Sequence, residues 1–316
     1  EEIRELPKGA WHNAMQVDGY SEPVNLVCRV TISPEGIEVD WTGTSGTSSH
    51  GINVPLTYAQ AYTSFGVRCV IGNDIPNNSG SLGVVRVTAP AGCILNAPRP
   101  SAVSARHAIG QMLPDVVLGC LDEPLAGQAP TEGAACLFGP VFLGGEGMIA
   151  DSQSKPFVMN AFYTGGTGAR PEKDGLSCTA FPSGVRSTPI EITENASPLV
   201  IWQKEYRPDS AGNGQFRGGF GQIMEFGHSN NEAFAVSKMF DRIDHPPRGR
   251  HGGGNGAPAS VYIKDGPTLK GMGRELIPAG STMVLETAGG SGRGHPEDRD
   301  RDSISSDQLS GLISKD

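Results

Sequence analysis

Two short groups of polar side chains have the residue types that proton transfer and carbonyl chemistry require. Arg106 and His107 are adjacent, and Asp74 lies close in the chain to Asn77 and Asn78. A histidine can bind or release a proton near neutral pH, and a guanidinium can bind an anionic oxygen. A carboxylate beside two amides can orient a water molecule or an amide substrate. The sequence therefore presents both groups as candidate catalytic residues.

The Asp74 group also has a purely structural interpretation. It belongs to the stretch NDIPNNSG, in which most residues are turn formers. Asp and Asn side chains stabilise tight turns by hydrogen bonding to nearby backbone groups. The residues alone favour turn formation here, and only the family resemblance given below makes catalysis equally open.

A helix is predicted over residues 55–70, directly before this turn. Its apolar residues recur at helical spacing and form one apolar face: Tyr58, Ala61, Tyr62, Phe65 and Cys69. Val84, Val85 and Val87 follow the turn and predict a strand. The turn should therefore connect a helix to a strand.

A second helix is predicted over residues 101–121. Pro98 and Pro100 exclude helix before it, and Ser101 can cap its N-terminus. Its apolar residues are three or four positions apart: Ala102, Ala105, Ile109, Met112, Val116 and Cys120. Pro114 should kink this helix or split it in two.

On this second helix, His107 lies about 200° around the axis from Ala105, so it should point away from the apolar face. The first turns of a helix also favour a neutral imidazole. Arg106 and His107 could therefore face a substrate or a subunit interface and donate to an anion or a carbonyl. The alternative is a surface or interdomain histidine whose ring is satisfied by a backbone carbonyl.

The rest of the chain predicts an α+β fold, rich in strands, with few helices, mixed sheets and many glycine-rich turns. Residues 24–33 and 36–42 alternate in polarity and form a hairpin. Further short strands are expected at 190–192, 199–205, 221–226, 234–237, 259–264 and 282–287. The composition changes at residues 122–131. We therefore expect an α+β segment at 1–125, a β-rich segment at 126–302 and a short C-terminal helix at 303–316.

Composition restricts the class of protein. The 316 residues include 44 glycines and 24 prolines, and the formal net charge of -9 argues against nucleic acid as a partner. No apolar run of membrane-spanning length occurs. The six cysteines form no CxxC pair, which favours free thiols in a cytoplasmic protein over a disulfide framework.

Other motifs are less suited to chemistry. The sequence GGTGARPEKDG at 165–175 lacks the phosphate-binding pattern GxxxxGK[ST], although Arg170 and Asp174 could line an interface or a pocket. The other glycine clusters are typical of close backbone packing. Residues 241–251 contain two histidines and two aspartates without metal-binding spacing, so a solvated loop is expected. No GxSxG nucleophile motif is present.

The order of five motifs resembles the hydantoinase B/oxoprolinase family. They cover nearly the whole chain: INVPL and DIPNN within 51–96, then 98–121, 165–175, 207–221 and 286–296. Family B-type subunits are longer, and this chain resembles their C-terminal portion. It begins with Glu1, and the NDPY...GGTH-like segment of the family, implied to bind metal, is not visible.

The resemblance implies a function that no composition argument gives. Family members pair with an A-type subunit, which resembles the ATP-binding acetate and sugar kinases. A hydrolase would phosphorylate a hydantoin or a 5-oxoproline-like lactam and then open its ring. The ATP would lie on the partner subunit, and a divalent metal such as zinc or manganese mainly on the missing N-terminal portion. A ketone carboxylase of the same family and a non-catalytic scaffold are the alternatives.

Overall fold

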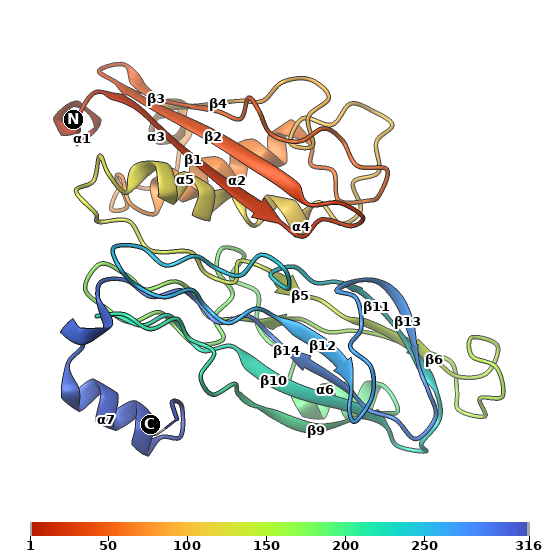
Figure 1. The fold of residues 1–316 in the computed structure, drawn as a ribbon. Coiled ribbons are helices and arrows are strands. Elements are labelled where there is room, and N and C mark those ends of the chain that lie inside the picture. Colours follow the sequence, from red (N-terminus) through yellow and green to blue (C-terminus); the bar gives the residue numbers. More distant parts are fainter. Residues whose placement is uncertain (1, 315–316) are drawn as a thin grey trace. The chain divides into compact units, whose positions relative to one another are not determined.

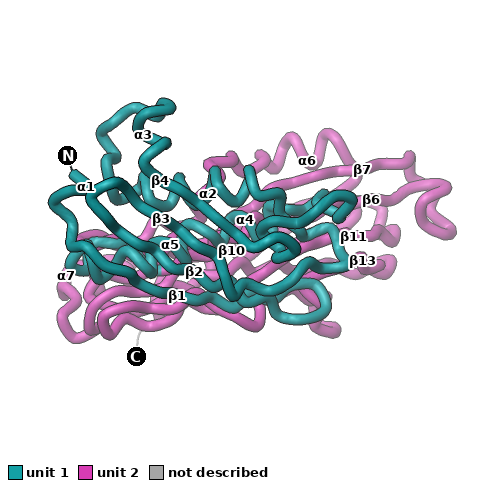
Figure 2. Tube along the Cα trace, turned by 90° about the horizontal axis from the view of Figure 1, so that it is seen from above, with its two compact units in different colours: residues 1–131 teal, residues 132–316 magenta. Residues whose placement is uncertain are grey.

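The computed structural model describes residues 2–314. The chain divides into two compact units, residues 1–131 and 132–316, which are coloured separately in Figure 2. The division follows Thr131, at the end of the stretch where the composition changes. The structure is a mixture of helices and strands in several sheets, which confirms the predicted α+β class.

The first unit is a four-stranded sheet with helices on one face (Figure 1). Strands β1 to β3 are antiparallel, and β4 runs parallel to β3 because α2 connects the two. The strands are β1 (Gly9–Val17), β2 (Val24–Ser33), β3 (Gly36–Asp40) and β4 (Val85–Thr88). The helices are α1 (Glu2–Glu5), α2 (Leu56–Arg68), α3 (Ser79–Gly83), α4 (His107–Gly110) and α5 (Leu113–Leu121).

The core of this unit lies between the sheet and helices α2 and α5. Strand β2 alternates between buried and more exposed residues, as a strand with one covered face should. Val30 and Val39 face each other across β2 and β3, and both are fully buried. The buried indole of Trp41 donates a hydrogen bond to the Thr63 hydroxyl on α2 (3.2 Å). The hairpin and the first helix are thus confirmed.

The second predicted helix is only partly correct. Helix begins at His107 rather than Ser101, so Ser101 caps nothing and donates to the carbonyl of Pro98 (2.5 Å). Residues 101–106 bond instead to the preceding loop, because Ala105 N–H donates to the Gly51 carbonyl (2.8 Å). Pro114 lies in the first turn of α5, where its missing N–H costs no helical bond. The predicted split into two helices is confirmed.

The second unit contains two four-stranded antiparallel sheets and one two-stranded sheet. The sheet orders are β12-β14-β10-β9, β13-β11-β6-β7 and β5-β8. The first sheet has β9 (Leu199–Tyr206), β10 (Gln222–His228), β12 (Ser260–Ile263) and β14 (Met283–Glu286). The second has β6 (Val141–Gly144), β7 (Phe157–Asn160), β11 (Phe234–Met239) and β13 (Met272–Ile277), and the third has β5 (Leu137–Phe138) and β8 (Tyr163–Thr164).

Aromatic side chains join the two larger sheets of this unit. The rings of Phe142 on β6 and Phe226 on β10 have centroids 4.9 Å apart, and Phe234 on β11 also contacts Phe142. All three are fully buried. Inward-facing aromatic residues of two sheets form a core of this kind in β-sandwiches.

The helices of the second unit contradict one prediction and confirm another. Residues 190–192, expected as a strand, begin helix α6 (Ile190–Ala196), which starts directly after Pro189. Three residues cannot distinguish the two periodicities, and the proline marks a helix start as well as a loop. The predicted C-terminal helix is α7 (Arg301–Leu309), preceded by a short 3-10 turn at Pro296–Asp298. Residues 315 and 316 lie outside the described residues.

Four glycine-rich segments of the second unit pack against one another without forming strands. They are residues 165–175, 207–221, 251–258 and 287–296. Backbone hydrogen bonds link them: Gly219 N–H to Thr167, Gly290 N–H to Gly219, and Gly292 N–H to Gly254 (2.8–2.9 Å). A Cβ atom on Gly290 would overlap the Thr167 carbonyl oxygen. We name these four segments the glycine bundle; close packing explains their glycines.

Within residues 2–314, every helix falls short of the length and apolarity that a membrane-spanning helix requires.

Candidate functional site

Helix α2 separates the two candidate groups. Tyr58 lies in its first turn, and the guanidinium of Arg106 packs over the Tyr58 ring, with the guanidinium carbon 5.4 Å from the ring centroid. At its last residue, Arg68 donates to the Asn77 side-chain oxygen (3.4 Å). Ten residues of helix correspond to about 15 Å along the axis. The structure therefore places Arg106 at one end of α2 and the Asp74 group at the other, and does not join them in one site.

The turn at residues 74–78 is held by Arg68 and by its own side chains. Arg68 donates to the carbonyls of Ile71 (3.1 Å) and Ile75 and to Asn77. Asn78 caps α3, since its side-chain oxygen accepts from the Ser81 N–H (3.1 Å) and its own N–H donates to the Ser81 hydroxyl (3.0 Å). These are the bonds of a capping box, so Asn78 has a defined structural role.

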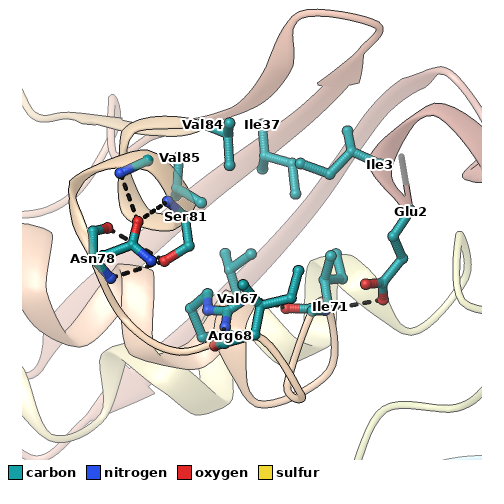
Figure 3. A pocket seen from close by; sticks show the side chains of 13 residues that line it. Glu2, Ile3, Ile37, Val67, Arg68, Ile71, Asn78, Ser81, Val84 and Val85 are labelled. Carbon is teal, nitrogen blue, oxygen red and sulfur yellow. Dashed lines mark hydrogen bonds between the residues drawn. The ribbon is translucent and has the colours of Figure 1, made fainter.

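A cavity of about 250 Å³ opens beside this turn (Figure 3). Its walls are mainly aliphatic, with Ile37, Val67 and Val84 among them, and Asn78 lies at its edge. The Glu2 carboxylate at the other side accepts from Gly72 N–H (2.9 Å). Asp74 and Asn77 are exposed and do not line the cavity. This lining favours an apolar group over a reacting amide.

Arg106 and His107 form a more reactive arrangement at the opposite end of α2. Arg106 precedes α4 and is exposed, and the Tyr58 ring beneath it stacks on Tyr62 with centroids 4.7 Å apart. His107 is the first residue of α4 and is half-buried. Burial lowers the pKa of His107, and the charge of Arg106 lowers it further. At neutral pH this places a proton acceptor directly beside an exposed cation.

Residues 42–53 support this end of the unit, and sequence reasoning treated them only as a loop. The buried side chain of Asn53 donates to the carbonyls of Ser48 (2.8 Å), His50 (2.9 Å) and Ala102 (2.9 Å). Its oxygen accepts from Ser48 N–H (2.8 Å). One amide thereby joins the loop to the segment that leads into His107. Asn53 is the asparagine of the INVPL motif, so the motif was a signal for this role. The sequence alone does not show that its side chain is buried.

This loop also forms one side of a polar hollow of about 490 Å³. The rings of Tyr20 and His50 stack there with centroids 3.7 Å apart and planes 14° apart. Serine and threonine hydroxyls supply much of the remaining lining. The hollow can accept a polar, uncharged group through hydroxyl hydrogen bonds.

In the second unit, Arg170 and Asp174 line a hollow, but both side chains already take part in ion pairs or hydrogen bonds within the protein. The Asp174 carboxylate pairs with Arg299 (2.8 Å), and its carbonyl accepts from the Arg170 guanidinium (2.7 and 3.0 Å). Arg299 and Arg217 also bind Asp307 on α7 (2.9 and 2.8 Å). The network fastens α7 to the glycine bundle.

The predicted solvated loop at 241–251 is wrong at its start. Asp241 and Arg242 are buried, and Arg242 lies 3.6 Å from the carboxylate of buried Glu132. Arg248 donates to the same carboxylate from its side chain (2.8 Å) and its N–H (3.0 Å). Burial alone would raise the pKa of Glu132, but Arg242 and Arg248 outweigh it and lower the pKa. Glu132, which is distant in sequence, thus pairs with Arg242 and Arg248 and makes the start of this segment part of the core.

Residues 2–314 contain no group of three or more His, Cys, Asp or Glu side chains that could hold a metal ion. The described residues therefore do not fit the expected divalent metal by themselves. All six cysteines are free thiols, as predicted, and Cys28, Cys93, Cys120 and Cys136 are buried.

Comparison with known proteins agrees with the fold. The profile described as Hydantoinase B/oxoprolinase matches residues 1–296. A putative B-type subunit of a D-/L-hydantoinase from Pseudomonas sp. (strain NS671) is 29% identical, with 99% of this chain and 55% of that protein covered. The chain thus spans about half the length of this relative.

Two solved structures share the fold. An acetone carboxylase in its nucleotide-free form has a TM-score of 0.83 at 16% identity, covering 99% of this chain and 49% of the other. An ATP-dependent caprolactamase from Pseudomonas jessenii has a TM-score of 0.82 at 17% identity, covering 99% and 56%. The sequence match and the ordered motifs agree: the chain belongs to the hydantoinase B/oxoprolinase family.

Proposed function

We propose that this chain is the C-terminal part of the B-type subunit of an ATP-dependent amidohydrolase that opens a hydantoin or lactam ring. The sequence match to a putative B-type hydantoinase subunit over nearly the whole chain carries this proposal. An A-type partner subunit would bind ATP, and the N-terminal portion of the same subunit would hold a divalent metal such as zinc or manganese. The six free thiols support a cytoplasmic location.

The chemistry explains why ATP is needed. A lactam carbonyl is a weak electrophile, and transfer of a phosphoryl group to its oxygen creates a good leaving group. Water then adds to the ring carbon and a base removes its proton. The carbon–nitrogen bond breaks as the nitrogen takes up a proton, and a second water hydrolyses the resulting acyl phosphate to a carboxylate and phosphate. An enclosed site with fixed charges stabilises the anionic species on this path.

Arg106 and His107 are the residues of this chain best suited to that site. The exposed Arg106 guanidinium can bind an anionic phosphoryl oxygen, and its stacking on Tyr58 fixes its position. His107, with its lowered pKa, can accept the proton of the attacking water. Asp74 and Asn77 remain candidates for orienting a substrate from the other end of α2.

Turnover of the assembled enzyme tests these roles. The complex with its A-type subunit is isolated, its composition is measured by native mass spectrometry, and hydantoins and lactams are assayed with ATP. Arg106→Ala and His107→Ala should each lower kcat by about 100-fold or more while assembly is preserved. Arg86→Ala and His12→Ala, exposed positions of the same unit, should leave kcat unchanged. Full activity of both test variants in an intact complex would leave a scaffold role for this chain.

The fold shared with an acetone carboxylase supports a second candidate, an ATP-dependent ketone carboxylase. The same substrate panel separates the two reactions. A carboxylase consumes a ketone only when ATP and bicarbonate are both present, and it leaves hydantoins and lactams unchanged.

A further inference from the structure

A pocket in the second unit has the features of an anion-binding site and is independent of the reaction proposed above. It has a volume of about 460 Å³ and lies between residues 178–187 and the end of strand β9. Its polar lining comes from six residues: Cys178, Ser187, Lys204, Glu205, Tyr206 and Gln222. Lys204 is the only cation among them.

Lys204 reaches this pocket from the edge of its sheet. It faces Met224 across strands β9 and β10, and because Met224 is fully buried, Lys204 lies on the core-facing side. Strand β9 is the last strand in the sheet order, so no further strand among residues 2–314 covers this edge. The ammonium therefore lies beside the core and still borders an open pocket.

The position of the ammonium is fixed, and one of its protons is left for a ligand. Its nitrogen donates to the Ser187 hydroxyl (2.9 Å) and to the Thr188 carbonyl (3.4 Å), and it lies 5.6 Å from the ring centroid of Tyr163. An ammonium has three donors, and these two bonds use two. The Ser187 hydroxyl accepts from Lys204, so its own proton is free to turn toward the pocket.

The hydrogen-bond partners of Lys204 do not neutralise its charge. Burial lowers the pKa of Lys204, while Cys178 and the carboxylate of Glu191 act in the opposite direction; the two hydrogen-bond partners are both uncharged. Cys178, another residue of the lining, has a left-handed backbone (φ 47°), which is unfavourable for a residue other than glycine. Backbone strain of this kind gathers at ligand sites.

We propose that this pocket binds a small organic monocarboxylate, with its carboxylate on Lys204 and Ser187 and its body along Tyr206. One ammonium and one hydroxyl match the two oxygens of a single carboxylate. These two donors leave the further oxygens of a dianion such as phosphate without partners.

Binding of benzoate to the purified, assembled protein tests this site, with benzamide as the neutral analogue and inorganic phosphate as the dianion. We expect benzoate to bind about tenfold or more tightly than the other two, as measured by calorimetry. Lys204→Met should weaken benzoate binding by about tenfold or more, and Ser187→Ala should weaken it less. Lys264→Met is the matched control, because Lys264 is an exposed lysine paired with Glu225 (2.7 Å), and it should change nothing.

Alkylation of Cys178 supplies a readout at the pocket itself. Burial raises the pKa of Cys178 to about 12, so its reaction with iodoacetamide is slow and is followed by peptide mass spectrometry. Benzoate should slow this reaction further and should not affect Cys69, a half-buried thiol of the first unit. The protection should disappear in Lys204→Met. Equal protection by benzamide, or protection that persists in Lys204→Met, overturns the proposal.

Discussion

At the scale of single residues, the proposed role of His107 depends on the charge of its neighbour Arg106. His107 is half-buried beside Arg106, so its imidazole loses hydration and also faces a positive charge. Both effects disfavour the imidazolium. The sequence predicted the adjacency of the two residues and their position near a helix start. It could not predict the burial, which depends on how the folded chain packs around the ring.

We expect Arg106→Gln to raise the pKa of His107 while burial keeps it below the usual value. NMR titration of the ring measures this shift. In the assembled enzyme, the acidic limb of the pH–rate profile should move to higher pH in the same variant, because the base is protonated sooner. An unchanged pKa would show that Arg106 does not act on the ring.

The pH dependence of folding stability should also reflect the lowered pKa of His107. A histidine whose pKa is lowered by folding binds its proton more strongly in the unfolded chain, so stability falls as pH drops below 6.5 and is retained above it. His107→Gln should therefore reduce the acid sensitivity of unfolding by urea. The lowered pKa of His228, also caused by burial, should leave the remaining sensitivity in place.

At the scale of elements, local sequence patterns correctly predicted those helices and strands that are stabilised by hydrogen bonds between residues near in the chain. Helix α2 and the β2–β3 hairpin follow from periodicity and turn residues. Residues 101–106 show the limit, because the Ala105 N–H bonds to Gly51 and the Ala102 carbonyl bonds to the Asn53 side chain. The sequence analysis also missed strand β1. Strand β2 could have been the outer strand of the sheet, so its pattern did not require a further partner.

Asn53→Ala should destabilise the protein by about 2–4 kcal/mol, because it removes four hydrogen bonds of one buried side chain and leaves their partners unpaired. Asn77→Ala, at an exposed position, should cost less than about 0.5 kcal/mol. Urea unfolding compares the two free energies of unfolding. Equal losses would mean that the 42–53 loop does not depend on Asn53.

At the scale of the whole molecule, the second unit depends on contacts between distant segments. The glycine bundle joins four stretches of chain, and α7 is tied to it by Arg217 and Arg299 through Asp307. The sequence indicated that these glycines serve packing, but spacing alone could not show which segments meet. The buried Glu132–Arg242 pair has the same origin, since its partners are far apart in the chain.

Gly290→Ala should destabilise the protein by more than about 3 kcal/mol, because its Cβ would displace the Thr167 carbonyl and the backbone bonds around it. Gly83→Ala is the control. Gly83 ends helix α3 with nothing within 4 Å of an added Cβ, so stability should be unchanged or slightly higher. Thermal unfolding of both variants measures the difference. A Gly290→Ala protein as stable as the Gly83→Ala protein would contradict close packing.

The glycine bundle has a consequence for how mutations in its gene will be read. Every missense change at a glycine codon adds at least one carbon atom, and positions such as Gly166, Gly218 and Gly290 have no volume for it. A mutational scan should therefore show a block of intolerance here as strict as that of a catalytic motif. The spacing of the glycines could then be mistaken for that of a nucleotide-binding loop. In this unit, intolerance would instead map the places where one chain backbone lies directly against another.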